Sequence, residues 1–205
     1  DPVYTPDMLS KFLENLKSNN CEIALHTGIG CYAGDKIAES KQALEQSSGI
    51  KLRGLRPHYL SARFPEYWKA ASECKFSYSS ALGFDDDIGF IEGIDLPIIP
   101  FDAGADKPVD IVEIPIAIMD CGLIGNRPAL SESVMARGMK LIDRCAQSGS
   151  LIVFDWHQRT LYKRDYPGWG ELLFRLLDRA RSKGAYFATV SEIAEIMMER
   201  YRDCP

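Results

Sequence analysis

Short apolar segments alternate with amphipathic helices along most of this chain, and glycine or proline separates many of them. Strands that alternate with helices are typical of parallel βαβ units, because parallel neighbours need a crossover connection. The pattern therefore predicts an α/β protein built on parallel strands. Helices are expected at about 8–19, 35–48, 66–73, 131–147, 171–183 and from 189 onward, and strands at about 21–25, 52–56, 76–78, 111–119, 151–154 and 185–188.

The composition is that of a single globular domain. A chain of 205 residues can bury one large core, and we expect residues 1–205 to form one domain. The net charge of -5 and the pI near 5.3 argue against a nucleic-acid partner, which usually meets a basic surface. No apolar run approaches the roughly 20 residues that span a bilayer. No signal peptide is recognisable at this N-terminus, so no membrane partner is expected.

Six cysteines are scattered along the chain without a Cys-x-x-Cys pair. This spacing is typical neither of a zinc ribbon nor of a small disulfide scaffold. We therefore expect reduced thiols and a cytoplasmic location.

The stretch Gly54–Leu60 carries several groups that can grip a polar ligand. Pro57 fixes its own φ and disfavours helix for Arg56, so a short strand should end there in a rigid corner. The corner would present Arg56, His58 and Tyr59 together. The alternative is an ordinary loop with a surface arginine and a tyrosine that caps the core.

All three histidines of the chain lie at or just beyond the ends of predicted strands. His26 follows the apolar run 21–25, and His157 follows the run 151–154 after Asp155 and Trp156. Asp120 ends the run 111–119 in the same way. Because the carboxyl ends of parallel strands meet on one face, these side chains are expected to build a site there. Imidazole and carboxylate groups suit metal binding and proton transfer.

Two loops are open to two interpretations. The glycine-rich loop 27–34 fits no phosphate-binding motif, so a plain connection is favoured over a ligand loop. The loop 82–90 holds three successive carboxylates, Asp85, Asp86 and Asp87. Like charges at close range are costly to bury, which predicts a solvated loop. The functional alternative is that one of them meets a cation or a histidine.

Five short blocks of the sequence together resemble, in order and in spacing, the polysaccharide deacetylase family of carbohydrate esterases. The likeness is greatest to a branch of uncharacterised deacetylase-like proteins. It covers nearly the whole chain and includes the stretch Tyr166–Trp169. The blocks are Glu22–Thr27, Gly54–Leu60, Leu82–Phe90, Glu113–Pro115 with Met119–Asp120, and Asp155–His157.

The resemblance implies a distorted (β/α) barrel that removes acetyl groups from a carbohydrate or a related N-acetylated substrate. His26 matches the first histidine of the metal-binding His-Ser/Thr-x-x-His motif. Arg56 and Tyr59 match the motif of the substrate groove. His157 matches the late histidine that acts as general acid, and Asp86 is matched to the aspartate that supports it. These matches imply a hydrolase with a divalent metal, most often zinc.

The implied mechanism uses the metal to polarise the acetyl carbonyl and to lower the pKa of a bound water. An aspartate base would deprotonate that water while His157 protonates the departing amine. We assign Asp120 and Trp156 to substrate binding, together with Arg56 and Tyr59.

The chain departs from the family pattern at the metal. Gly30 stands where the second metal-binding histidine is expected, and the paired aspartates of the family belong to a strand that is not found in this chain. The first strands of the barrel can lie upstream of the chain shown, with His58 completing a metal site with His26. Alternatively, the protein has lost the metal and the deacetylase activity.

Two further hypotheses follow from that second possibility. One is a catalytically inactive carbohydrate-binding domain that retains Arg56, Tyr59, Trp156 and His157 as a sugar groove. The other is an α/β scaffold whose histidines only satisfy structural contacts.

Overall fold

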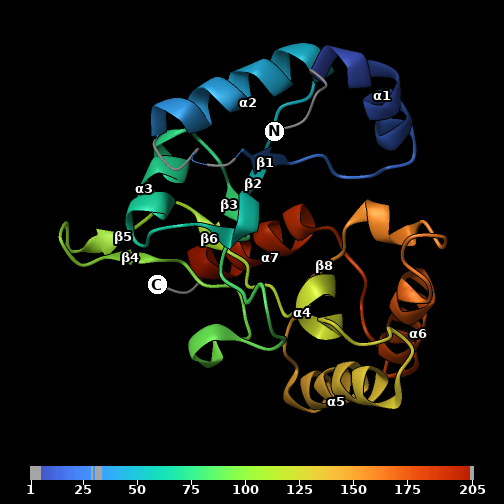
Figure 1. Cartoon of the computed structure of the whole chain (residues 1–205). Helices are drawn as coiled ribbons and strands as arrows, with labels where there is room; N and C mark the ends of the chain where they lie inside the picture. The colour runs from blue at the N-terminus through green and yellow to red at the C-terminus, as the bar shows by residue number, and fades with distance from the viewer. Residues whose placement is uncertain (1–5, 29, 31–33, 204–205) are drawn as a thin grey trace. The chain divides into compact units, whose positions relative to one another are not determined.

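The structure is a computed structural model that describes residues 6–28, 30 and 34–203. The described chain contains seven α-helices and short, mostly parallel strands (Figure 1). It divides into two compact units, the first formed by residues 1–81, 97–114 and 188–205 and the second by residues 82–96 and 115–187. That residues 1–205 act as one domain stays a prediction.

The first unit is organised around a four-stranded parallel sheet in the order β1-β2-β3-β6. Its strands are β1 (Leu25–Thr27), β2 (Gly54–Pro57), β3 (Tyr78–Ser79) and β6 (Val112–Glu113). Glycine is required at the start of β2, because a Cβ at Gly54 would lie 1.8 Å from the ring of Tyr78. Polar residues lie at or next to the carboxyl ends of these four strands, namely Thr27, Arg56, Ser79 and Glu113.

Helices cover this sheet and bury its apolar side chains. The elements are η1 (Pro6–Leu9), α1 (Ser10–Ser18), α2 (Gly34–Ser48), η2 (His58–Leu60), α3 (Glu66–Glu73) and α7 (Val190–Asp203), with the antiparallel pair β4 (Phe101–Asp102) and β5 (Lys107–Pro108). Ile37 from α2 and Tyr67 and Ala71 from α3 pack with Leu25 and Leu55 of the sheet. These side chains are almost fully buried.

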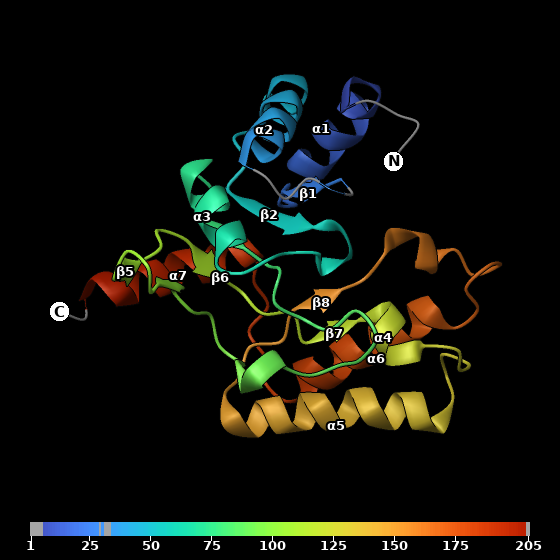
Figure 2. The ribbon, with the colours of Figure 1, turned by 60° about the vertical axis from the view of Figure 1, so that its left-hand side comes forward.

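The second unit holds the parallel pair β7 (Ile118–Met119) and β8 (Phe154–Asp155). The remaining elements are η3 (Ile91–Gly93), α4 (Asp120–Ile124), α5 (Glu132–Ser148), η4 (Gln158–Leu161) and α6 (Trp169–Ser182). Figure 2 shows α4 directly after β7, with α5 and α6 side by side beneath the strand pair. The core of this unit lies between these helices and the two strands.

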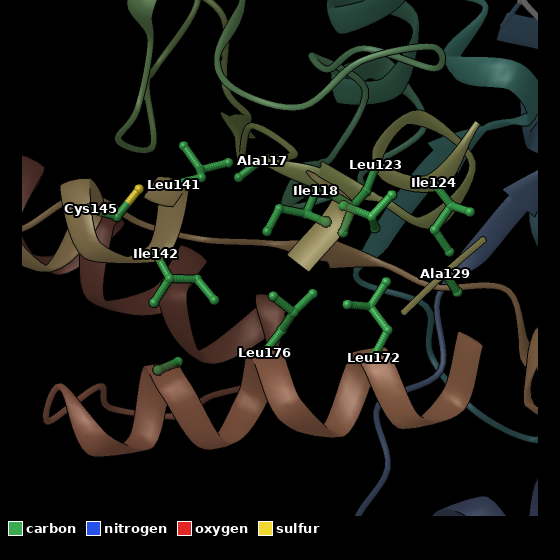
Figure 3. Close-up of a cluster of buried hydrophobic side chains, with 12 residues drawn as sticks. Ala117, Ile118, Leu123, Ile124, Ala129, Leu141, Ile142, Cys145, Leu172 and Leu176 are labelled. Atoms are coloured by element: carbon green, nitrogen blue, oxygen red, sulfur yellow. The ribbon is translucent and has the colours of Figure 1, made fainter. Parts of the chain in front are cut away.

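The packing of α5 against α6 follows from the spacing of their apolar residues. Val134, Leu141 and Ile142 recur at helical intervals on α5, and Leu172 and Leu176 do so on α6. Figure 3 shows Leu141 and Ile142 near Leu172 and Leu176. Gly138 allows close approach, since a Cβ there would lie 2.6 Å from Leu176 Cδ2. Helix α5 ends at Ser148. The next residue, Gly149, has a φ of 74°, the left-handed conformation that terminates many helices.

The predicted α/β class with parallel strands is confirmed, and the barrel stays a prediction because the described strands form three separate sheets. The strand predicted at 185–188 is wrong. Tyr186 and Phe187 are exposed, and no described strand pairs with this segment, so its backbone has no ladder to join. Most of the loop 27–34 lies outside the described residues. No helix in the described ranges is long and apolar enough to cross a membrane.

Candidate functional site

A buried carboxylate and a half-buried imidazole are hydrogen-bonded at the ends of β7 and β8. The two strands pair with Met119 opposite Asp155, so Asp120 and His157 follow neighbouring strand ends. His157 donates twice to Asp120, from its backbone N–H to Oδ2 at 2.9 Å and from Nδ1 to Oδ1 at 2.8 Å. A carboxylate only accepts, so Nδ1 carries a hydrogen and Nε2 is the nitrogen left to exchange a proton.

The pair shifts both pKa values in the direction of an ion pair. The hydrogen bond that His157 donates to Asp120 raises the pKa of His157, against the opposing effect of burial. Burial alone would raise the pKa of Asp120, but the side-chain and backbone hydrogen bonds of His157 outweigh it and lower that pKa. Asp120 is fully buried, which excludes water as a competing partner. Both shifts therefore favour the charged forms, an imidazolium beside a carboxylate.

Cys121 lies next to this pair, and the three residues are the only group of three potential metal ligands that the described chain brings within 4.8 Å of one another. Metal binding needs a thiolate. Burial raises the pKa of the Cys121 thiol to about 11, and the negative charge of Asp120 adds to this effect. The donor set thus suits a hydrogen-bonded His–Asp pair better than a metal centre.

Replacing Asp120 by asparagine should lower the pKa of His157, because the neutral amide no longer stabilises the imidazolium. The two pKa shifts make the stability of the fold depend on pH in opposite directions. The raised pKa of His157 stabilises the fold fully below about pH 6.5, and this contribution is lost as the pH rises through the folded-state pKa. The lowered pKa of Asp120 stabilises the fold above its unfolded value, and this contribution is lost in acid.

An NMR titration of the His157 ring in wild-type protein and in Asp120→Asn measures the difference. Asp86→Asn is the matched control, since Asp86 is the aspartate that the sequence assigned to the support of His157. A fall of the His157 pKa in Asp86→Asn, with none in Asp120→Asn, would show that the carboxylates have been assigned in the wrong order.

The structure places the other predicted residues of the second unit differently. Asp86 is exposed in the loop 82–90, and it is its neighbour Asp87 that forms an ion pair with Arg137. Trp156 packs against the core of the unit, and its indole Nε1 is enclosed without a hydrogen-bond partner among the described residues. Asp120, predicted to bind substrate, accepts two hydrogen bonds from His157. The substrate-binding roles stay predictions.

The first unit brings the other two histidines together. The register of β1 and β2 sets His26 opposite Arg56, two residues before His58. The ring centroids of His26 and His58 lie 5.1 Å apart, and the ring of Tyr59 meets that of His58 edge-on at 4.3 Å. Tyr59 is 69% exposed and has a φ of 55°, a conformation that is strained for a bulky residue. This corner thus displays an aromatic ring beside two imidazoles.

The side chain of Arg56 is held by hydrogen bonds to Ser80, which follows the neighbouring strand β3. Its Nε donates to the backbone oxygen of Ser80 at 3.2 Å, and its Nη2 donates to Ser80 Oγ at 3.0 Å. The predicted corner therefore presents a partly buried guanidinium whose direction is set by Ser80, the residue after β3.

Glu113 was not assigned a role from the sequence, yet it is the most enclosed charge of the sheet. Its side chain is fully buried and accepts hydrogen bonds from Trp68 Nε1 at 2.8 Å, from the backbone N–H of Ala81 at 2.7 Å and from Ser79 Oγ. A glutamate within the apolar run 111–119 was the available signal, because a charge in a buried strand must find partners.

Comparison with known proteins by sequence gives no assignment. No protein-family model matches the chain, and no curated protein matches it.

Three solved structures share the fold over most of the chain. A protein from Mycobacterium smegmatis assigned to the polysaccharide deacetylases is 20% identical, with a TM-score of 0.67, over 98% of this chain and 71% of its own. A second such protein, from Pseudomonas aeruginosa PAO1, is 17% identical with a TM-score of 0.64 over 91% and 62%. An allantoinase is 16% identical with a TM-score of 0.56 over 93% and 62%. The chain spans less than two thirds of the last two.

The fold and its polar groups define an α/β protein whose reactive side chains gather at the carboxyl ends of parallel strands. More particularly, the fold is the one shared by the polysaccharide deacetylases and the allantoinase. The family resemblance of the sequence is thus confirmed at the level of the fold. Identities below 25% show a shared fold alone.

Proposed function

We propose that this chain is a metal-dependent hydrolase that removes acetyl groups from a carbohydrate or a related N-acetylated substrate. The proposal is supported by the fold and by one observation above all, the His157–Asp120 pair at the ends of β7 and β8. The distorted (β/α) barrel of the deacetylases belongs to the same proposal.

His157 is suited to protonate the leaving amine. Its Nδ1 is engaged by Asp120, so the hydrogen exchanged with substrate is the one on Nε2. The side chain is 33% exposed, which leaves the ring accessible, while Asp120 is fully buried and keeps the imidazolium charged. A general acid of this kind works best when its pKa lies near the working pH.

Arg56 and Tyr59 are suited to position a polyhydroxylated substrate in the first unit. The guanidinium of Arg56 is fixed by Ser80, and the exposed ring of Tyr59 offers a face on which a sugar can stack. Arg56 lies near the end of β2, and Tyr59 follows the strand in η2.

A divalent metal such as zinc, when bound, would polarise the acetyl carbonyl and supply a water of lowered pKa. His26 is the residue of the described chain that best fits it, as an exposed imidazole whose Nδ1 is oriented by the backbone oxygen of Arg56 at 3.1 Å.

A catalytically inactive carbohydrate-binding domain is the second candidate. It is favoured by Gly30, which removes one expected metal ligand, and by the exposed Tyr59 at the corner after β2. This candidate predicts sugar binding that a chelator does not change.

The experiment that separates the two incubates the chain with oligomers of N-acetylglucosamine and measures both released acetate and free amine. We expect both products to appear, to fall at least about ten-fold with chelator, and to return with zinc. Allantoin serves as a second, chemically different amide. Oligosaccharide binding without acetate release would support the binding domain, and neither binding nor release would remove both candidates.

A further inference from the structure

A groove in the second unit lies between α5 and the loop segment 84–95. Its volume is about 590 Å³, within the roughly 300–1,000 Å³ that is typical of small-ligand sites. The lining residues come from this segment, from the C-terminal half of α5 and from Ser150. Asp120 and His157 are not among them. The groove therefore offers room for a ligand that the proposed chemistry at His157 does not use.

The floor of the groove is apolar and carries aromatic rings. Leu141 and Cys145 stand one turn apart on α5 and are almost fully buried (Figure 3). Burial raises the pKa of the Cys145 thiol, so this group is uncharged at neutral pH. Phe84 and Phe90 line the same groove and are partly exposed, and Phe90 also packs against the core of the unit. The rings can therefore meet a ligand without leaving their places.

Polar groups of both kinds line the rest of the groove. The Ser150 hydroxyl donates to the carboxylate of Asp95 and is also hydrogen-bonded to the Ser148 hydroxyl. Arg144 is exposed, and its side chain forms no hydrogen bond or ion pair within the described ranges 6–28, 30 and 34–203. The charge of Asp95 raises the pKa of the Cys145 thiol while that of Arg144 lowers it, so both charges lie near the same sulfur.

This combination suits a neutral polyhydroxylated ligand. A negative and a positive charge near the same point repel ions of either sign, and neither repels a neutral molecule. Arg144 and Gln147 offer hydrogen-bond donors, Asp95 offers an acceptor, and the serine hydroxyls act as both. Sugars carry hydroxyls around an apolar ring face, which fits a polar rim beside the rings of Phe84 and Phe90.

The walls of the groove fit an extended peptide less well. A peptide that adds to a sheet needs a strand edge with a row of open backbone groups. Here one wall is a helix, whose backbone groups bond within it, and the other is a loop with an isolated β-bridge at Ile88. The loop wall is open at Gly89 and Gly93, where an added Cβ would meet nothing within 4 Å. The space beside the loop is thus wide enough for a ring.

We propose that the groove between α5 and residues 84–95 binds a neutral oligosaccharide, as a second carbohydrate site beside the one proposed at Arg56 and Tyr59. The first site belongs to the first unit, and this one is built entirely from the second. The proposal goes beyond the proposed hydrolase activity. It concerns binding alone and stands whether or not acetate is released.

The test is a titration of the whole chain with the tetramer of N-acetylglucosamine, followed by the NMR shifts of the backbone amides. We expect saturable shifts at residues 84–95 and 141–150, which persist in Tyr59→Ala. Arg144→Ala should bind at this groove about ten-fold more weakly, because a charged hydrogen-bond donor is lost, and Phe84→Ala should also weaken binding. Lys140→Ala is the matched control, an exposed cation one turn earlier on α5 that does not line the groove, and should stay within about two-fold of wild type.

Three results would overturn the proposal. Absence of shifts at the groove, with or without a response near Tyr59, would leave no second site. Wild-type affinity in both Arg144→Ala and Phe84→Ala would place the sugar elsewhere. Equal shifts with hexanol, unchanged in Arg144→Ala, would assign the groove to apolar ligands. If circular dichroism shows that Phe84→Ala is misfolded, Gln147→Ala at an exposed position replaces it, and wild-type affinity in this variant and in Arg144→Ala would refute the polar rim.

Discussion

Replacing His157 by alanine should lower kcat for deacetylation by about 10²–10⁴-fold, the usual contribution of a general acid. KM should change little, because the imidazole is proposed to act on the leaving amine and not to bind the sugar. The hydrogen bond to Asp120 raises the pKa of His157, which favours the protonated form of the proposed acid. The measurement is a steady-state assay of acetate release at several pH values.

A second variant separates catalysis from folding, since alanine leaves the buried carboxylate of Asp120 without its side-chain donor. His157→Asn places an amide N–H near the position of Nδ1 and keeps a donor for Asp120, but it cannot exchange a proton at Nε2. Gln158→Ala, at the next and exposed residue, is the matched control. Full activity in His157→Asn would exclude His157 as the acid.

The helices could largely be predicted from the sequence, because their signals are local. The helix expected at 35–48 is α2 at Gly34–Ser48, and the one expected at 131–147 is α5 at Glu132–Ser148. The apolar spacing lies within α5 and the terminating Gly149 follows it directly, so no distant contact is needed to place the ends.

The strands were harder to predict because their hydrogen bonds connect distant residues. The single strand expected at 111–119 is two, β6 at Val112–Glu113 and β7 at Ile118–Met119, which belong to different sheets. Pro115 lies between them and cannot donate to a ladder. Beyond Pro115, the backbone pairs with the segment that contains Val153.

In the candidate site, too, local features could be predicted from the sequence and distant contacts could not. That His26, His58 and His157 stand at strand ends was visible in the sequence, since each follows an apolar run. Which carboxylate faces His157 was not, because the choice between Asp86 and Asp120 depends on the pairing of β7 with β8. Glu113 was overlooked for a similar reason, since its three donors come from α3, from β3 and from the residues after β3.

Replacing Glu113 by alanine should lower the free energy of unfolding of the first unit by at least about 3 kcal/mol. The change leaves the N–H groups of Trp68 and Ala81 and the hydroxyl of Ser79 without their acceptor, and each unsatisfied buried group costs about 1–3 kcal/mol. The position is fully buried, so these donors are not exposed to bulk solvent. Urea unfolding followed by circular dichroism measures the loss.

Two variants show whether the acceptor itself carries that stability. Glu113→Gln keeps one acceptor oxygen but adds an amide that can only donate, so its loss should fall between wild type and alanine. Asp110→Ala changes an exposed carboxylate three residues earlier and should stay within about 0.5 kcal/mol of wild type. If Glu113→Ala lost less than about 1 kcal/mol, the buried donors would have found other partners, and the network would not hold the ends of β3 and β6 together.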